Sequence, residues 1–271
     1  MADQPIIDGE LRKALRQVQL LETDLWDAKL DPTATRHALE LVRKGQFEPV
    51  PGTRSKRPRR PKKPVYGYFT PVESYPELIA ARRDQRGWRL SDQQIEQFAG
   101  QLVTHAGRLQ PTGARLWLGE SLRFNWDELR LWALDMAAAA GLVPNDWVNN
   151  LSVAFWPGSE RGGEPSLEPC GLDFETYWCP QEGIVPRDVQ QENEDWPGLE
   201  VATFCALNPR YMVAANAQAG GAPFLLAGGL RIDADDLPWF RRSGQSFGAD
   251  FYWRSYRFHH TSLVGFRELQ H

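Results

Sequence analysis

The chain has 271 residues, of which 42% are hydrophobic, enough apolar material for one large packed domain or two smaller ones. Its formal charge of −4, from 31 lysines and arginines against 35 aspartates and glutamates, excludes a nucleic-acid-binding surface that is basic throughout. No apolar run approaches the length of a membrane-spanning helix, and the first residues lack the apolar core of a signal peptide, so we expect a cytoplasmic protein without membrane contact. We also expect a prokaryotic source.

Residues 1–46 predict a helical hairpin. Apolar side chains recur at steps of three and four from Leu11 to Ala28, which places them on one stripe of a helix. Asp31 then supplies an N-cap for a second helix, which Gly45 ends. Because so small a unit buries little surface alone, its stripe is expected to dock on the rest of the chain, on a second copy or on a protein partner.

Residues 47–64 predict a flexible, proline-rich basic linker. Its seven cations are Arg54, Lys56, Arg57, Arg59, Arg60, Lys62 and Lys63. Without them, 24 basic residues face 35 acidic ones, a balance of −11, so positive charge is concentrated here. The prolines favour extended polyproline geometry, which spans about 3.1 Å per residue. Solvated cations of this kind predict non-specific binding to nucleic acid or another polyanion; the alternative is a spacer that only aids solubility.

Residues 65–271 predict a mixed α+β body. It opens with a short strand, VYGYF, at residues 65–69. Ser91 and Gln94 form a capping box before an amphipathic helix that Gly107 ends.

A second strand and a second helix follow. The strand is ARLWL at residues 114–118, and Asn125 with Glu128 forms a capping box for the helix, which Gly141 ends.

Beyond Pro144, short aromatic and β-branched runs alternate with turn residues and predict a β-rich half. The runs are LSVAFW (151–156), LDFETYW (172–178), VATFCAL (201–207), YMVAAN (211–216), PFLLAGGL (223–230) and FYWRSYRF (251–258). The glycine pairs at 220–221 and 228–229 predict turns, because neither lies in a phosphate-binding motif.

The cysteines and histidines predict no metal site and no cofactor. Cys170, Cys179 and Cys205 are an odd number without CxxC spacing, so they are interpreted as buried free thiols. His259 and His260 are adjacent, and on a strand they would point to opposite faces. No catalytic residue is predicted.

The last aromatic run supplies a candidate binding surface. Alternation along a strand would place Tyr252, Arg254, Tyr256 and Phe258 on one face and Phe251, Trp253, Ser255 and Arg257 on the other. Aromatic rings beside arginines give contact area together with charged hydrogen bonds, which suits recognition. The candidate residues are Tyr252, Arg254, Tyr256, Arg257, His259 and His260.

The segment RSGQSFGADFYWRSYRFHHTSLVGFREL, residues 242–269, resembles the end of the formylglycine-generating enzyme or sulfatase-modifying-factor family, a variant of the C-type lectin fold. That family closes with an Arg-Gly-Gly-Ser-Trp-like element, an Arg-rich strand and a Gly-Phe-Arg strand, and here Ser243–Phe247, Arg254–Arg257 and Val264–Arg267 occupy those places. FNWDELRLWALDMAAAAGL, residues 124–142, is similar to the family's helix that opens with Ser-Trp-Asp-Glu.

The resemblance implies a C-type lectin-like body without oxidase chemistry. The places of the family's two copper-binding cysteines are held by Trp253 and Phe258, neither of which binds copper. We therefore expect a non-enzymatic binding or regulatory protein that uses its aromatic and arginine surface for a protein or ligand partner. The alternative is an enzyme with a pocket around Arg254, Arg257, His259 and His260.

Overall fold

The computed structural model describes residues 68–103, 111–148, 151–179, 182–215, 222–233 and 235–268. All of them belong to one compact unit, Arg60–His271. The hairpin expected at residues 1–46 and the linker expected at 47–64, with its seven cations, lie outside the described residues.

The described body mixes helices and strands, as expected. The helices are η2 (Val72–Ser74), α3 (Tyr75–Arg86), α4 (Asp92–Val103), α5 (Leu122–Ala139), α6 (Pro186–Val189), α7 (Leu199–Leu207) and α8 (Pro209–Ala214). The strands are β1 (Thr112–Trp117), β2 (Val143–Asp146), β3 (Val153–Phe155), β4 (Ser166–Asp173), β5 (Phe224–Leu226), β6 (Leu230–Ile232), β7 (Asp236–Ser243), β8 (Ser246–Trp253), β9 (Thr261–Leu263) and β10 (Gly265–Arg267).

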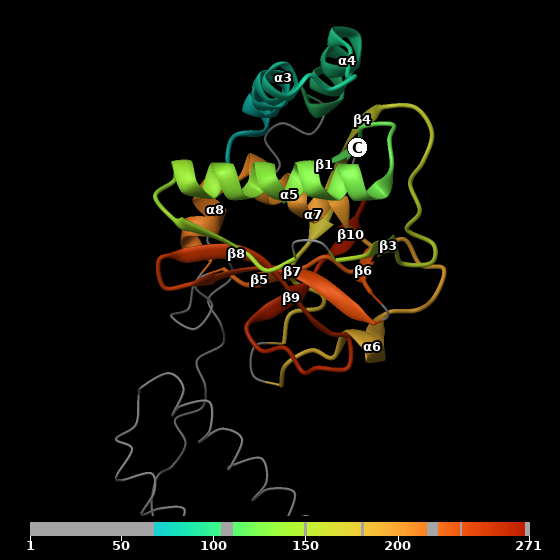
Figure 1. The fold of residues 1–271 in the computed structure, drawn as a ribbon, viewed down its shortest axis with the longest axis vertical. Helices are drawn as coiled ribbons and strands as arrows, with labels where there is room; N and C mark the ends of the chain where they lie inside the picture. The colour runs from blue at the N-terminus through green and yellow to red at the C-terminus, as the bar shows by residue number, and fades with distance from the viewer. Residues whose placement is uncertain are drawn as a thin grey trace, which may run out of the picture. The chain divides into compact units, whose positions relative to one another are not determined.

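The strands form two sheets. In the smaller, β4 lies between β1 and β10 and is antiparallel to both. The larger follows the order β2-β8-β7-β5-β9, and β6 joins β3 to β7. Its centre is the β7–β8 hairpin, whose two-residue turn contains Gly244 at φ 59°. Figure 1 shows α5 running across the larger sheet, with α3 and α4 on the other side of this helix.

The larger sheet is apolar on both faces. Phe240, Phe247 and Ala249 belong to the main core beneath the helices, which also contains Trp126 of α5. A second, smaller cluster covers the opposite face. Its buried members are Trp156, Ile184, Trp196, Leu226, Leu237, Phe258 and Leu263. Adjacent strand residues point to opposite faces, and every residue of the short strands β5 and β9 is buried except half-buried Phe224, so both faces of the larger sheet are covered there.

Local signals predicted the start of α4 and the end of α5 correctly, while Gly107, the expected end of α4, lies outside the described residues. The Ser91 amide donates to Gln94 Oε1 at 2.9 Å and the Gln94 amide donates to Ser91 Oγ at 3.2 Å, which confirms the capping box. The strand predicted at 114–118 is confirmed as β1, and Gly141 follows α5 with φ 88°. Gly228 and Gly229 form the expected turn.

The predicted start of α5 was wrong. Ser121 is the N-cap and its hydroxyl accepts from the Phe124 amide at 3.3 Å, so the helix begins one turn before the expected capping box. Asn125 instead accepts from the Leu118 amide at 2.7 Å, and Glu128 accepts from the Trp88 indole at 3.1 Å. Both polar side chains are buried and accept from neighbouring segments, while the Asn125 side-chain amide also donates to the carbonyl of the N-cap residue Ser121 at 2.9 Å.

Two predicted strands were also wrong, and LDFETYW was wrong beyond its first two residues, because β4 ends at Asp173. VATFCAL and YMVAAN lie mainly in α7 and α8. Every residue of α7 is buried, so its sequence lacks the polar face that would reveal a helical period. Tyr68 and Phe69, the described part of the strand expected at 65–69, lie outside any strand and precede η2.

Candidate functional site

The candidate residues lie where the larger sheet ends, and not along one strand as expected. β8 stops at Trp253, because the chain turns at Arg254 and Ser255. The Arg254 amide donates to the carbonyl of Asp235 at 3.0 Å, and the Tyr256 amide donates back to the carbonyl of Trp253 at 2.9 Å. The two-face alternation predicted for residues 251–258 is therefore wrong beyond Trp253.

The turn gathers three exposed rings that the strand pattern had placed on opposite faces. Tyr252, Trp253 and Tyr256, hereafter the aromatic surface, are 39%, 63% and 46% exposed. The ring centroid of Tyr252 lies 4.4 Å from that of Tyr256 and 5.5 Å from that of Trp253. Both tyrosines also pack edge-on against Phe258, which is buried in the small cluster. The exposed rings therefore stand on a fixed apolar base.

Arg254 is held beside these rings by two neighbours. Its Nη1 lies 3.2 Å from Asp235 Oδ1, and its guanidinium carbon lies 4.1 Å from the centroid of the Trp156 ring. Burial lowers the pKa of Arg254, an effect that Asp235 opposes. A cation that is stacked and paired in this way supports the turn after β8.

Arg257 and the two histidines have other neighbours. Arg257 Nη1 donates to the Glu182 carbonyl at 3.0 Å, and Phe258 exchanges two backbone hydrogen bonds of 2.8 Å with Ile184. The histidines follow this bridge and precede β9, so the expectation that they alternate along a strand is wrong. His260 has φ 58°, a left-handed conformation.

Aspartates border the aromatic surface on its β7 side. Asp236 is the strand partner of Trp253, and Asp233 and Asp235 precede it in the β6–β7 connection. Burial raises the pKa of Asp236, and the negative charges of Asp233 and Asp235 raise it further. The aromatic surface therefore lies next to a negative edge.

The cysteines and the acidic side chains give no sign of a metal site in the described ranges. No group of three or more histidine, cysteine, aspartate or glutamate residues among them is arranged to hold a metal ion. Cys170 and Cys205 are buried, as expected, and burial raises the pKa of both thiols. Cys179 is exposed, which corrects the expectation that all three thiols are buried.

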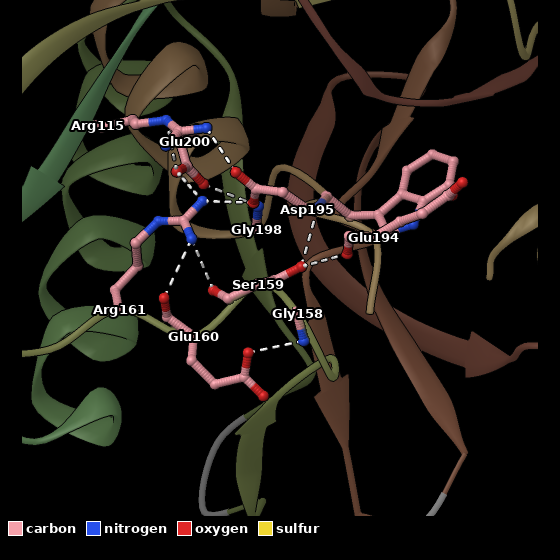
Figure 2. A network of polar contacts seen from close by, with 10 residues as sticks. Arg115, Gly158, Ser159, Glu160, Arg161, Glu194, Asp195, Gly198 and Glu200 are labelled. Atoms are coloured by element: carbon pink, nitrogen blue, oxygen red, sulfur yellow. Dashed lines mark hydrogen bonds and ion pairs between the residues drawn. The ribbon is translucent and has the colours of Figure 1, made fainter. Parts of the chain in front are cut away.

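Sequence reasoning missed a network of two arginines and two acids (Figure 2). Arg161 Nη2 lies 2.7 Å from Asp195 and 3.1 Å from Glu200. Arg115 of β1 lies 2.8 Å from Asp195 and 3.7 Å from Glu200. Glu200, in the first turn of α7, also accepts from the Gly198 amide at 2.9 Å. We call these four charged residues the ionic network.

The ionic network is charge-balanced and joins separate segments. Burial lowers the pKa of Arg161, but Glu200 and Asp195 outweigh this effect and the pKa is raised. Figure 2 shows Ser159 beside the network, where its hydroxyl accepts from the Trp196 amide at 2.8 Å. Because the charges neutralise one another, the network fits a role in fixing two loops to α7 and β1.

Comparisons of the chain with protein-family models, with curated proteins and with solved structures found no match. Within the described ranges, no helix is long and apolar enough to span a membrane.

Proposed function

We propose that this chain is a non-enzymatic binding or regulatory protein whose aromatic surface contacts a protein partner. The observation that carries this function is the cluster of three exposed rings, Tyr252, Trp253 and Tyr256. The two tyrosines contact the buried ring of Phe258, and Trp253 contacts Tyr252. Clustered exposed rings are typical of the energetic centres of protein interfaces.

The backbone around these rings favours a preformed site. The β7–β8 hairpin carries Tyr252 and Trp253, and the contacts of Arg254 with Asp235 and Trp156 hold the following turn. Tyrosine and tryptophan have only two side-chain torsions, so ordering them on binding costs little entropy.

The alternative, an enzyme with a pocket around Arg254, Arg257, His259 and His260, is less well supported. The guanidinium of Arg254 contacts Asp235 and Trp156, whereas that of Arg257 contacts the Glu182 carbonyl. Since the two arginines have separate partners, no shared ligand is needed to account for either.

We extend the proposal to a C-type lectin-like body of the formylglycine-generating-enzyme type that works in a prokaryotic cytoplasm. Two features agree with the resemblance: the Ser243–Ser246 turn joins two strands, and Gly265–Arg267 is itself a strand. The Arg-rich element at 254–257 is a turn and loop, which differs from the family's strand.

Affinity capture tests the aromatic surface. The tagged full chain is incubated with lysate from its own source, and captured proteins are compared between wild type and Trp253→Ala/Tyr256→Ala. Trp147→Ala is the matched control, because Trp147 is 58% exposed but belongs to the segment after β2. We expect the partner to be lost only with the double variant; equal capture by all three proteins would refute the assignment.

The basic linker at 47–64 forms the second part of the proposed function, as a non-specific contact to nucleic acid or another polyanion. Seven cations fully engaged on duplex DNA give a log–log salt slope of about −6, and partial engagement gives a shallower one. Replacing all seven by glutamine should abolish binding to a labelled random duplex while leaving the unfolding transition unchanged. Equal binding by both proteins at low salt would show the segment to be a spacer.

A further inference from the structure

An open groove lies between the C-terminal end of α5 and α8, away from the aromatic surface. Its volume is about 720 Å³, within the range of about 300 to 1,000 Å³ that is common for small-molecule sites. The lining residues are Tyr68, Met136, Ala139, Ala140, Pro209, Arg210, Val213 and Ala214. Figure 1 shows α8 lying under one end of α5.

Apart from Tyr68 and Arg210, the side chains that line this groove are small or aliphatic. Three alanines and a proline leave the two helices with little side-chain bulk, and Met136 and Val213 add flexible or branched hydrocarbon. The backbone groups that a helix C-terminus leaves unpaired are carbonyls, and here those of Met136, Ala138 and Ala214 accept from the amides of Ala140, Gly141 and Ala222. Such a wall favours a hydrocarbon chain, which needs no hydrogen bonds.

One cation stands at the rim. Arg210 is exposed and, within the described residues, has no hydrogen bond or ion pair, and none of the lining residues is acidic. Arg242, next to Val213, donates to the carbonyls of Gly244 and Val213 instead of to a carboxylate. By contrast, arginines such as Arg82 and Arg86 are paired with acids. The groove therefore has an apolar wall, and at one side it has the positive charge of Arg210, which no acid among the described residues neutralises.

We propose that this groove binds an aliphatic carboxylate, with the hydrocarbon chain along the alanine-rich wall and the carboxylate paired with Arg210. Guanidinium and carboxylate groups match in geometry, so a single arginine orients such a ligand. The hydrocarbon supplies most of the affinity, because each buried methylene strengthens binding about fourfold. This site is independent of the aromatic surface and of the protein partner proposed for it.

Calorimetric titration with sodium dodecanoate, below its micelle concentration, tests the assignment on the full chain. We expect one ligand per chain. Arg210→Gln should weaken binding about fivefold, the upper range for an exposed ion pair. Ala140→Trp, at an exposed position at the end of α5, should fill the groove and abolish binding. Arg89→Gln is the control, because Arg89 is also exposed and also has no partner among the described residues.

Three outcomes would overturn the inference. If dodecanoate does not bind, the groove is not a site for an aliphatic carboxylate. Unchanged binding to Ala140→Trp, in a variant whose unfolding transition matches wild type, places the ligand elsewhere. Equal affinity for uncharged dodecanol and for dodecanoate, together with no effect of Arg210→Gln, would show that Arg210 does not bind the carboxylate and that the groove does not select for one.

Discussion

The ionic network and the aromatic surface each combine residues of strands or helices with residues of connecting segments, but the network buries charged groups whereas the surface exposes aromatic rings. In the ionic network, two arginines face two acids, and Glu200 is nearly inaccessible to solvent. In the aromatic surface, three rings face solvent above a buried base. A charge that is buried must be neutralised within the fold, whereas an exposed ring keeps contact area available. This contrast agrees with a stabilising role for the ionic network and with the recognition role that we propose for the aromatic surface.

Of the substitutions considered, removing the ring of Phe258 beneath the aromatic surface should lower the free energy of unfolding the most. Phe258 is buried and its ring lies 5.3 Å from that of Trp239, so Phe258→Ala removes a ring from a closed cluster. We expect the free energy of unfolding to fall by about 3 kcal/mol, measured by urea denaturation. Trp253→Ala, at a mainly exposed position, should change it by no more than about 0.5 kcal/mol.

A loss below about 1 kcal/mol for Phe258→Ala would contradict this comparison. It would mean that the small cluster is not a packed core and that the rings above it lack a fixed base.

Removing an acidic charge from the ionic network should lower the free energy of unfolding by a smaller amount. Glu200→Gln keeps the shape and one acceptor for the Gly198 amide, but among the described residues it leaves Asp195 as the one acid that pairs with Arg115 and Arg161. We expect a loss of about 2 kcal/mol in the free energy of unfolding, below the value for a wholly buried pair because Asp195 and Arg115 are partly exposed. Asp195→Asn should cost less, about 0.5 to 1 kcal/mol.

If Glu200→Gln were as stable as wild type, the burial cost of the glutamate would equal its attraction to the arginines. The ionic network would then not stabilise the fold, and its role would have to be sought elsewhere.

The fold was predictable where local signals suffice. α4 is half exposed and carries its own capping box, so its period and its start are both visible in the sequence. α7 is buried on every side, so nothing in VATFCAL separates a helix from a strand. The ionic network was not predictable, because Arg115 and Glu200 are brought together only by the packing of α7 on β1.

The candidate site was predictable in composition but not in shape. Tyr252 and Tyr256 were expected on one face of a strand, but their rings are in contact through the turn, and Trp253, expected on the opposite face, joins them. The turn after Trp253 contains no glycine or proline. The turn is fixed by the hydrogen bond from the Arg254 amide to the carbonyl of Asp235, the residue just before β7. Sequence spacing does not reveal this contact.

Neutralising an aspartate beside the aromatic surface should change the free energy of unfolding the least. Burial and its acidic neighbours raise the pKa of Asp236 in the folded state. A raised carboxyl pKa means that the charged form disfavours folding at any pH above the folded-state pKa. Asp236→Asn removes that charge, so at neutral pH it should raise the free energy of unfolding by a few tenths of a kcal/mol, after allowance for solvent screening.

This gain should vanish on acidification, because below a pH of about 3.9 the aspartate of the wild type is protonated in both states. It should also shrink as salt screens Asp233 and Asp235. Asp235→Asn is the matched control with the opposite sign at neutral pH, since Asp235 pairs with Arg254. Urea denaturation of both variants at neutral and acid pH measures the difference. A destabilised Asp236→Asn protein at neutral pH would show that the negative edge supports the hairpin rather than opposing it.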